Sequence, residues 1–170
     1  GVLDALVGAA EETTSGLRPL RSFDLRIPVM ASNDARSKTL FDNAYGTGQS
    51  CWTTILDLID PRGVGAPVAR MSVVVIGYRD VGRGCARFGA ALGARVTVVE
   101  MDPVRALQAS MDGFAVASLE EAAASAGMLI SATGERSTIP LSALETAPEG
   151  AIVTVAGGVD GEVSIDEAVA

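Results

Sequence analysis

Short apolar, β-branched runs alternate with segments of helical periodicity along most of the chain. The run at 72–77 ends at Gly77 and has the character of a strand buried on both faces. The segment after it places four apolar side chains on one helical face before a stop at Gly93, namely Val81, Cys85, Phe88 and Leu92. Further strands are predicted at 95–99, 114–117, 128–132 and 151–155, with helices at 103–111, 119–125 and 141–145. Such alternation predicts an α/β fold, a Rossmann-like doubly wound parallel sheet in a single domain.

A lead-in segment, residues 1–35, precedes this pattern. It contains an apolar stretch at 2–10, helical or extended, and a short extended run at 25–30. Ser32, Asn33 and Asp34 can cap a helix, so a long helix is predicted from there to about Asp60, where Pro61 ends it. Two glycines weaken this helix and favour a bend, Gly46 and Gly48. The Rossmann-like part is assigned to 36–170, and both parts are expected to form one compact domain.

The turn between the first sheet strand and its helix carries a glycine pattern. The motif G-x-G-x-x-G is typical of dinucleotide-binding βαβ units, and here it is Gly77, Tyr78, Arg79, Asp80, Val81, Gly82. Arg79 replaces the middle glycine, which normally lets the backbone approach a pyrophosphate. Two interpretations stay open: the arginine blocks the pyrophosphate, or it swings outward and pairs with a phosphate.

Composition narrows the possible functions. The net charge is -8, from 21 acidic and 13 basic residues, which argues against nucleic-acid binding. The absence of histidine removes the usual histidine-based triads and metal sites. Cys51 and Cys85 are far apart in sequence and lack metal-site spacing, so they are read as small apolar helix residues and no metal is predicted. No membrane span or secretory signal is recognised, and a cytoplasmic location is expected.

Five ordered blocks carry a family resemblance. They are residues 11–16 (EETTSG), 33–46 (NDARSKTLFDNAYG), 75–86 (VIGYRDVGRGCA), 100–113 (EMDPVRALQASMDG) and 131–134 (SATG). Together they resemble the NAD-binding domain of S-adenosylhomocysteine hydrolase, from about residue 9 to 170. The resemblance implies a tightly held NAD that oxidises the 3′-hydroxyl of a nucleoside ribose, elimination of homocysteine, addition of water and reduction of the ketone.

The resemblance also implies roles for single residues. Thr13, Thr14 and Ser15 would touch the cofactor, and Glu12 the substrate ribose. Lys38 and Asp42 would move protons at that ribose, with Asn43 beside them. Glu100 would bind the adenosine ribose of NAD, with Arg105 close by, and the nicotinamide side would be lined by Thr133 and Gly134.

Each assignment has a plain alternative. Lys38 and Asp42 are four residues apart on one helix face, so they can be a surface ion pair. Residues 13–15 can be a helix cap or turn, and Glu100 a solvated strand end. Arg105 can be a solvated helix residue, or it can favour a 2′-phosphate and hence NADP, which Glu100 would repel.

The sequence departs from the family pattern at several points. The resemblance implies a substrate-binding domain ahead of residue 11 and a C-terminal tail, and the expectation here is a chain without either. Arg79 replaces a glycine of the family, Arg105 an asparagine, and Gly158 an active-site histidine. These departures favour a stand-alone domain that has lost hydrolase and hydride-transfer activity. It would act as a redox-neutral small-molecule enzyme of cyclisation or isomerisation type, with a place in specialised metabolism. Two alternatives stay open: an NAD(P)- or adenine-nucleotide-binding module, and a regulatory or oligomerisation partner. A small-molecule ligand and a homo-oligomer are expected in either case.

Overall fold

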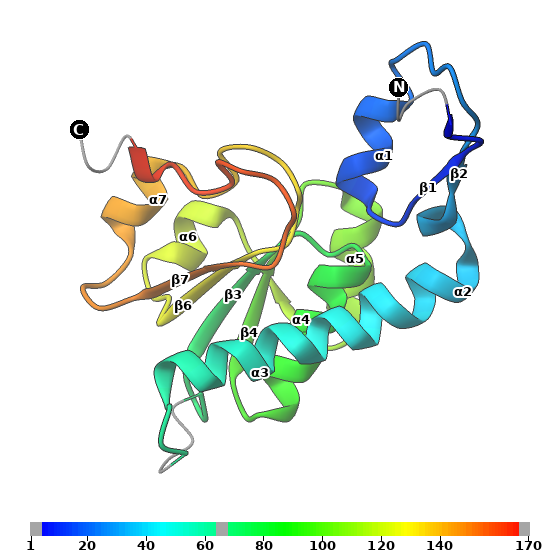
Figure 1. Ribbon diagram of the computed structural model, residues 1–170. Coiled ribbons are helices and arrows are strands. Elements are labelled where there is room, and N and C mark those ends of the chain that lie inside the picture. Colours follow the sequence, from blue (N-terminus) through cyan, green and yellow to red (C-terminus); the bar gives the residue numbers. More distant parts are fainter. Residues whose placement is uncertain (1–4, 64–67, 167–170) are drawn as a thin grey trace.

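The computed structural model describes residues 5–63 and 68–166 and contains a five-stranded parallel sheet (Figure 1). Its strand order is β5-β4-β3-β6-β7, so the chain winds outward in both directions from β3. The bounds are β3 Ser72–Ile76, β4 Arg95–Val99, β5 Ala115–Val116, β6 Met128–Ser131 and β7 Ile152–Val155. The predicted α/β, Rossmann-like doubly wound sheet is confirmed, because every predicted strand of this sheet is present.

Helices cover both faces of the sheet, which explains why β3 is apolar from Val73 to Ile76. On one face, Val73 and Val75 belong to one apolar cluster with residues of α3 (Thr47–Ile59), α4 (Asp80–Ala91) and α5 (Pro103–Met111). On the other face, Val74 and Ile76 belong to a second cluster with α6 (Leu119–Ala123) and α7 (Leu141–Thr146). A parallel strand between two helical layers needs apolar residues on both sides.

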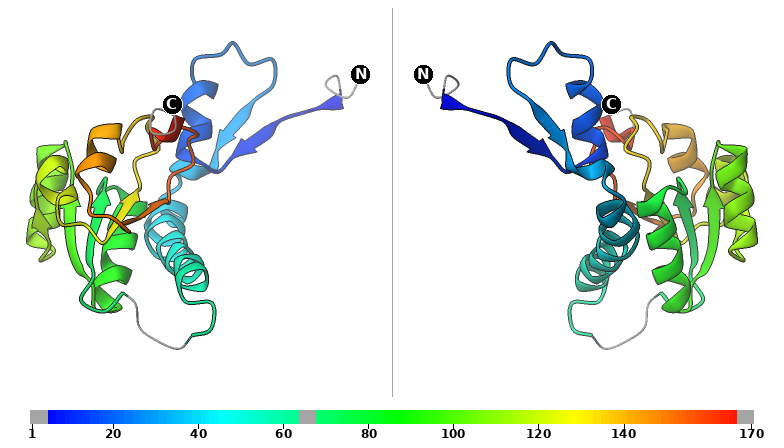
Figure 2. Two further views of the ribbon diagram at one scale, coloured as in Figure 1. Left: turned by 90° about the vertical axis from the view of Figure 1, so that its left-hand side faces the viewer. Right: turned by 90° about the vertical axis from the view of Figure 1, so that its right-hand side faces the viewer.

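The N-terminal segment forms a small unit of its own. β1 (Ala9–Glu11) pairs in parallel with β2 (Val29–Ala31), and α1 (Thr14–Leu20) connects them. Figure 2 shows this pair extending away from the five-stranded sheet. Pro28 lies just before β2, and its carbonyl oxygen accepts a hydrogen bond from the Ala9 N–H at 3.0 Å. The extended run predicted at 25–30 is therefore a strand only from Val29 onward.

The long helix begins later than predicted. Ser32–Asp34 (η2) is a single 3₁₀ turn, and extended backbone at Ala35 (φ -66°, ψ 127°) separates it from α2 (Arg36–Lys38). The helix continues through a π-helical stretch, η3 (Thr39–Gly46), into α3. It ends next to Asp60, as predicted. The start at Ser32 was wrong because those polar residues serve other contacts, described below.

Glycines let α3 and α4 cross at close range. A Cβ atom at Gly48 would lie only 2.9 Å from the Gly84 Cα, so a glycine at position 48 allows the two helices to pack this closely. Trp52 reinforces this contact, because its buried indole N–H donates to the Cys85 carbonyl at 2.8 Å. The two cysteines, remote in sequence, are brought together here, and their side chains share a hydrogen bond.

The chain after β7 returns to the loop that follows β6. Ile139 and Val163 form a parallel bridge, with the Ile139 N–H donating to the Glu162 carbonyl and the Ser164 N–H to the Ile139 carbonyl. In the part of the chain that the structure describes, no helix is long and apolar enough to cross a membrane.

Candidate functional site

A cleft of about 600 Å³ lies where the N-terminal segment faces the carboxyl ends of the strands. This volume lies in the range of small-molecule sites, and this edge of an open parallel sheet is where such folds place their ligands. The residues named above from the glycine motif and from the resemblance line the cleft, with the exception of Gly77, Gly82 and Glu100. Those that line it are Glu12, Thr13, Thr14, Ser15, Lys38, Asp42, Asn43, Arg79, Asp80, Val81, Arg105, Thr133 and Gly134.

The first and third glycines of the motif are required by the fold. Gly77 has a φ of +96°, a conformation that L side chains rarely adopt, and a Cβ atom there would lie 3.2 Å from the Ala132 carbonyl oxygen. A Cβ atom at Gly82 would overlap the carbonyl oxygen of Gly77. Arg79 between them has ordinary extended backbone (φ -71°, ψ -172°). The middle position is therefore free to carry a side chain without strain.

The Arg79 side chain lines the cleft and forms no hydrogen bond or ion pair with the residues that the structure describes. Its charge acts on the end of β4. The pKa of Asp102 is lowered chiefly by the backbone N–H of Arg105, and the positive charge of Arg79 adds to this effect. The guanidinium thus lies within electrostatic reach of the residues that follow β4.

Glu100 follows β4 and is held by three donors. Its carboxylate accepts the Tyr78 N–H at 2.7 Å, the Asp102 N–H at 2.9 Å and the Arg105 Nε–H at 3.2 Å. Burial raises the pKa of Glu100, but the N–H groups of Asp102 and Tyr78 together with Arg105 outweigh it and hold the pKa below its usual value. With a side chain only 8% exposed, Glu100 is a fixed anionic acceptor and is not a solvated strand end.

Arg105 is fixed against this carboxylate. Its Nε lies 3.2 Å from Glu100 Oε2 and its Nη2 lies 3.3 Å from Asp102 Oδ2. Asp102 also caps α5 by accepting the N–H groups of Val104 and Arg105. Arg105 is therefore part of a charged cluster at the cleft, not a solvated helix residue.

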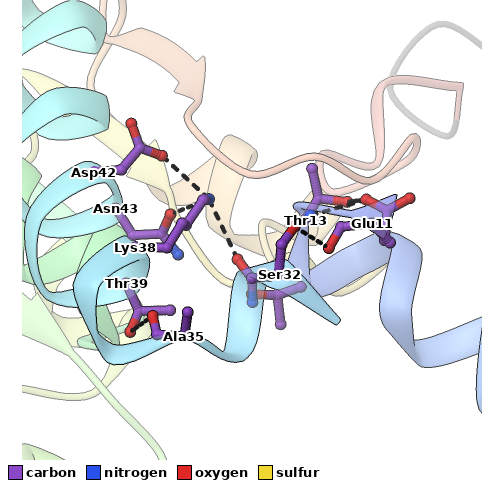
Figure 3. A network of polar contacts seen from close by, with 10 residues as sticks. Glu11, Thr13, Ser32, Ala35, Lys38, Thr39, Asp42 and Asn43 are labelled. Atoms are coloured by element: carbon purple, nitrogen blue, oxygen red, sulfur yellow. Dashed lines mark hydrogen bonds and ion pairs between the residues drawn. The ribbon is translucent and has the colours of Figure 1, made fainter. Parts of the chain in front are cut away.

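Lys38 is the centre of a second polar network (Figure 3). Its ammonium donates to Asn43 Oδ1 at 2.7 Å and to Asn33 Oδ1 at 3.3 Å, and it lies 3.1 Å from Asp42 Oδ2. The surface ion pair with Asp42 exists, but both asparagines are buried and orient the same amine. Sequence reasoning named Asn33 only as a helix-cap residue and not as part of the site, although it begins the block at 33–46.

Some polar residues of the N-terminal segment hold its structure through hydrogen bonds, whereas Glu12 is exposed at the cleft. Thr13 is the N-cap of α1: its hydroxyl accepts the Gly16 N–H at 3.0 Å and donates to Glu11 at 2.6 Å. Thr14 accepts from Asn33 at 3.1 Å, which ties α1 to the Lys38 network. Glu12 is exposed and lines the cleft.

The opposite wall of the cleft follows β6 and β7. The hydroxyl groups of Thr133 and Thr138 lie 2.6 Å apart, and Gly134 has a φ of +66°. Gly158, after β7, faces the N-terminal segment: a Cβ atom there would lie 3.1 Å from the Ser15 Oγ. Among the described residues, no group of histidine, cysteine, aspartate and glutamate side chains could hold a metal ion.

A doubly wound parallel sheet, its glycine turn and an anionic acceptor after β4 define a Rossmann-type domain of the dinucleotide-binding kind. The family model described as "S-adenosyl-L-homocysteine hydrolase, NAD binding domain" matches residues 43–170. The chain belongs to this family.

Individual relatives agree with this assignment. An adenosylhomocysteinase of Pyrococcus abyssi is 46% identical over 166 residues, which cover 95% of this chain and 38% of that protein. An S-inosyl-L-homocysteine hydrolase of Methanothermobacter thermautotrophicus is 41% identical over 167 residues, covering 96% of this chain and 39% of that one. The chain thus spans about two fifths of the length of these curated relatives.

A solved structure of the A chain of dipicolinate synthase from Bacillus subtilis superposes with a TM-score of 0.71. The superposition covers 95% of this chain and 52% of the synthase chain. The two sequences are 15% identical, so the similarity supports the fold alone.

Proposed function

We propose that the cleft binds NAD and that the chain acts as the cofactor domain of an enzyme that cleaves a nucleosyl-homocysteine. Glu100 carries the proposal. A carboxylate fixed by backbone N–H groups at the end of β4 is what recognition of an adenosine ribose requires, because its oxygens can accept from the 2′- and 3′-hydroxyl groups. Arg105 donates to Oε2 of this carboxylate, so on ligand binding its guanidinium would move aside or pair with the ligand.

Arg79 is compatible with this proposal. Its backbone is unstrained, and its charge acts on Asp102 at the ribose end of the cleft. A guanidinium on that side can donate to a phosphate oxygen while the turn between Gly77 and Gly82 keeps its shape.

The Lys38 network would supply the proton chemistry. The ammonium is oriented by Asn33 and Asn43, and Asp42 lies beside it. Such an arrangement can hold a substrate hydroxyl and move its proton, with Glu12 as a second carboxylate on the same cleft. NAD, when bound, supplies the hydride acceptor for that carbon.

Calorimetric titration of NAD and NADP into the wild-type chain and Glu100→Gln tests the proposal. We expect NAD to bind more tightly than NADP, since the ionised Glu100 repels a 2′-phosphate. We expect Glu100→Gln to weaken NAD binding about tenfold or more, because hydrogen bonds to a charged acceptor are lost. Glu149→Gln, at an exposed loop residue outside the cleft, is the matched control. Equal affinity in both variants would refute ribose recognition by Glu100.

A redox-neutral small-molecule enzyme is the second candidate. Two observations favour it: Arg79 stands in the pyrophosphate turn, and Gly158, packed closely against Ser15, stands where the family resemblance implies a histidine. The cleft would then hold an uncharged or anionic metabolite between Arg79 and Lys38. This candidate predicts a co-purified ligand other than a nucleotide, which native mass spectrometry followed by mass analysis of the released molecule would identify.

An oligomeric or regulatory role is a further proposal. Val104, Leu107 and Met111 are exposed and recur at helical spacing on α5. Apolar residues at this spacing can cover one another between subunits. Sedimentation of the chain over a range of concentrations tests this proposal, and a monomer at every concentration would count against it.

A further inference from the structure

Glu162 is a buried carboxyl that the functions above do not use. Its side chain is 1% exposed, and no lysine or arginine of the described chain lies within ion-pair distance of it. Two neutral donors hold it: the Ser131 hydroxyl donates to Oε2 at 2.5 Å, and the Val159 N–H donates to Oε1 at 3.3 Å. A carboxylate is costly to bury, so this position is poorly explained by core packing alone.

The two donors come from different segments that meet at one wall of the cleft. Ser131 is the last residue of β6, two positions before Thr133. Val159 directly follows the loop of Gly157 and Gly158, which lines the same wall. A Cβ atom at Gly157 would overlap the Glu162 carboxylate, so the loop backbone rests directly on this group. One side chain therefore sets the spacing between the end of β6 and the loop after β7.

This wall lies across the glycine turn from Glu100. β4 and β6 flank β3 on opposite sides, and the turn after β3 lies between them. In a doubly wound sheet, an extended dinucleotide crosses this switch point, so its two ends lie over the two halves of the sheet. With the adenosine at Glu100, the nicotinamide falls at the wall that Glu162 supports.

We infer that Glu162 is a positioning residue that shapes the nicotinamide side of the cleft. The inference rests on the proposed binding of NAD. Glu162 does not touch the ligand, and it acts by holding the backbone at Thr133 and Gly158.

Affinity for NAD relative to ADP-ribose tests this inference, because ADP-ribose lacks the nicotinamide ring but keeps the rest of the ligand. Glu162→Met keeps the side-chain length and removes both hydrogen bonds. It should weaken NAD binding about tenfold and leave ADP-ribose binding nearly unchanged. Glu162→Gln is the conservative control. Its amide carbonyl accepts from Val159 and its NH₂ donates to Ser131, since a hydroxyl accepts as well as donates. It should retain the wild-type ratio of affinities.

The outcomes separate the inference from the proposal beneath it. A variant that is merely less stable loses affinity for both ligands equally, and this result would overturn the inference while NAD binding stands. Failure of the wild-type chain to bind either ligand would overturn both. If Glu162→Met does not fold, Ser131→Ala removes one of the two hydrogen bonds. It should lower the preference for NAD in the same direction, and an unchanged ratio in that variant would also overturn the inference.

Discussion

The carbonyl oxygen of Gly77 lies where a Cβ atom of residue 82 would have to be. This contact closes the turn between β3 and α4, and it explains why Gly82 is glycine whatever the cleft binds. Arg79, between the two glycines, has no such constraint, because its backbone is extended and unstrained. The glycine motif thus separates into two positions required by the fold and one, Arg79, that lines the cleft.

Substitution at Gly82 should therefore act on folding. We expect Gly82→Ala to lower the free energy of unfolding by about 3 kcal/mol, because the backbone must shift to relieve the overlap. Arg79→Ala in the same turn is the control and should change stability by less than about 0.5 kcal/mol. Urea denaturation followed by the fluorescence of the single tryptophan, Trp52, measures both. Equal stability of the two variants would show that the turn tolerates a side chain at position 82.

The Lys38 network predicts that substitution of Lys38 lowers stability more than substitution of its ion-pair partner, Asp42. Lys38→Met should lower stability by about 1–2 kcal/mol, because the buried oxygens of Asn33 and Asn43 lose their donor. Asp42→Asn should cost less than about 0.5 kcal/mol, because Asp42 is exposed and its ion pair is screened. Chemical denaturation of both variants tests this order. A larger loss for Asp42→Asn would mean that the ion pair dominates.

The pH dependence of stability should report on Glu100. Its pKa in the folded protein is below the ordinary value of 4.5, so the ionised form stabilises the fold above that pH. This contribution disappears as the pH falls through the folded-state pKa. We expect the free energy of unfolding of the wild type to exceed that of Glu100→Gln by about 1.5 kcal/mol at neutral pH. This difference should shrink below pH 4.5. A difference that is constant with pH would contradict the assignment.

Contact between the cysteines should control their reactivity. The hydrogen bond from Cys85 lowers the pKa of Cys51 to about 7, whereas the same hydrogen bond and burial raise the pKa of Cys85. Alkylation of Cys51 should therefore have a midpoint near neutral pH in wild type. In Cys85→Ala the midpoint should move toward the ordinary value of 9.0. Mass spectrometry of alkylated peptides measures both, and an unshifted midpoint would exclude the hydrogen bond.

Much of the fold could be predicted from local patterns. The run at 73–76 is apolar on both faces, and the start of α5 is marked by a proline after a capping aspartate, Asp102. Such signals lie within a few residues of the element that they specify. The site residues that follow strands, such as Glu100, could also be predicted to face one edge, because parallel strands end together.

Tertiary contacts determine the start of the long helix and the burial of Glu162, which the sequence pattern could not predict. Residues 32–34 have the composition of a helix cap, but Ser32 donates to the Glu11 carbonyl and Asn33 contacts Thr14 and Lys38, so the helix begins later. Glu162 looks like a surface residue of a polar turn, and only the return of the chain along Ile139 buries it. Partners that are tens of residues away leave no periodic signal.

Titration of NAD into the wild-type chain and Arg79→Gly, with concentrations up to the millimolar range, tests the central claim most directly. If Arg79 lies to the side of the pyrophosphate turn, the wild-type chain binds one equivalent of NAD saturably, and Arg79→Gly binds no more tightly. If wild type gives no binding heat while Arg79→Gly binds, the arginine closes the site, and the natural chain does not serve as an NAD domain.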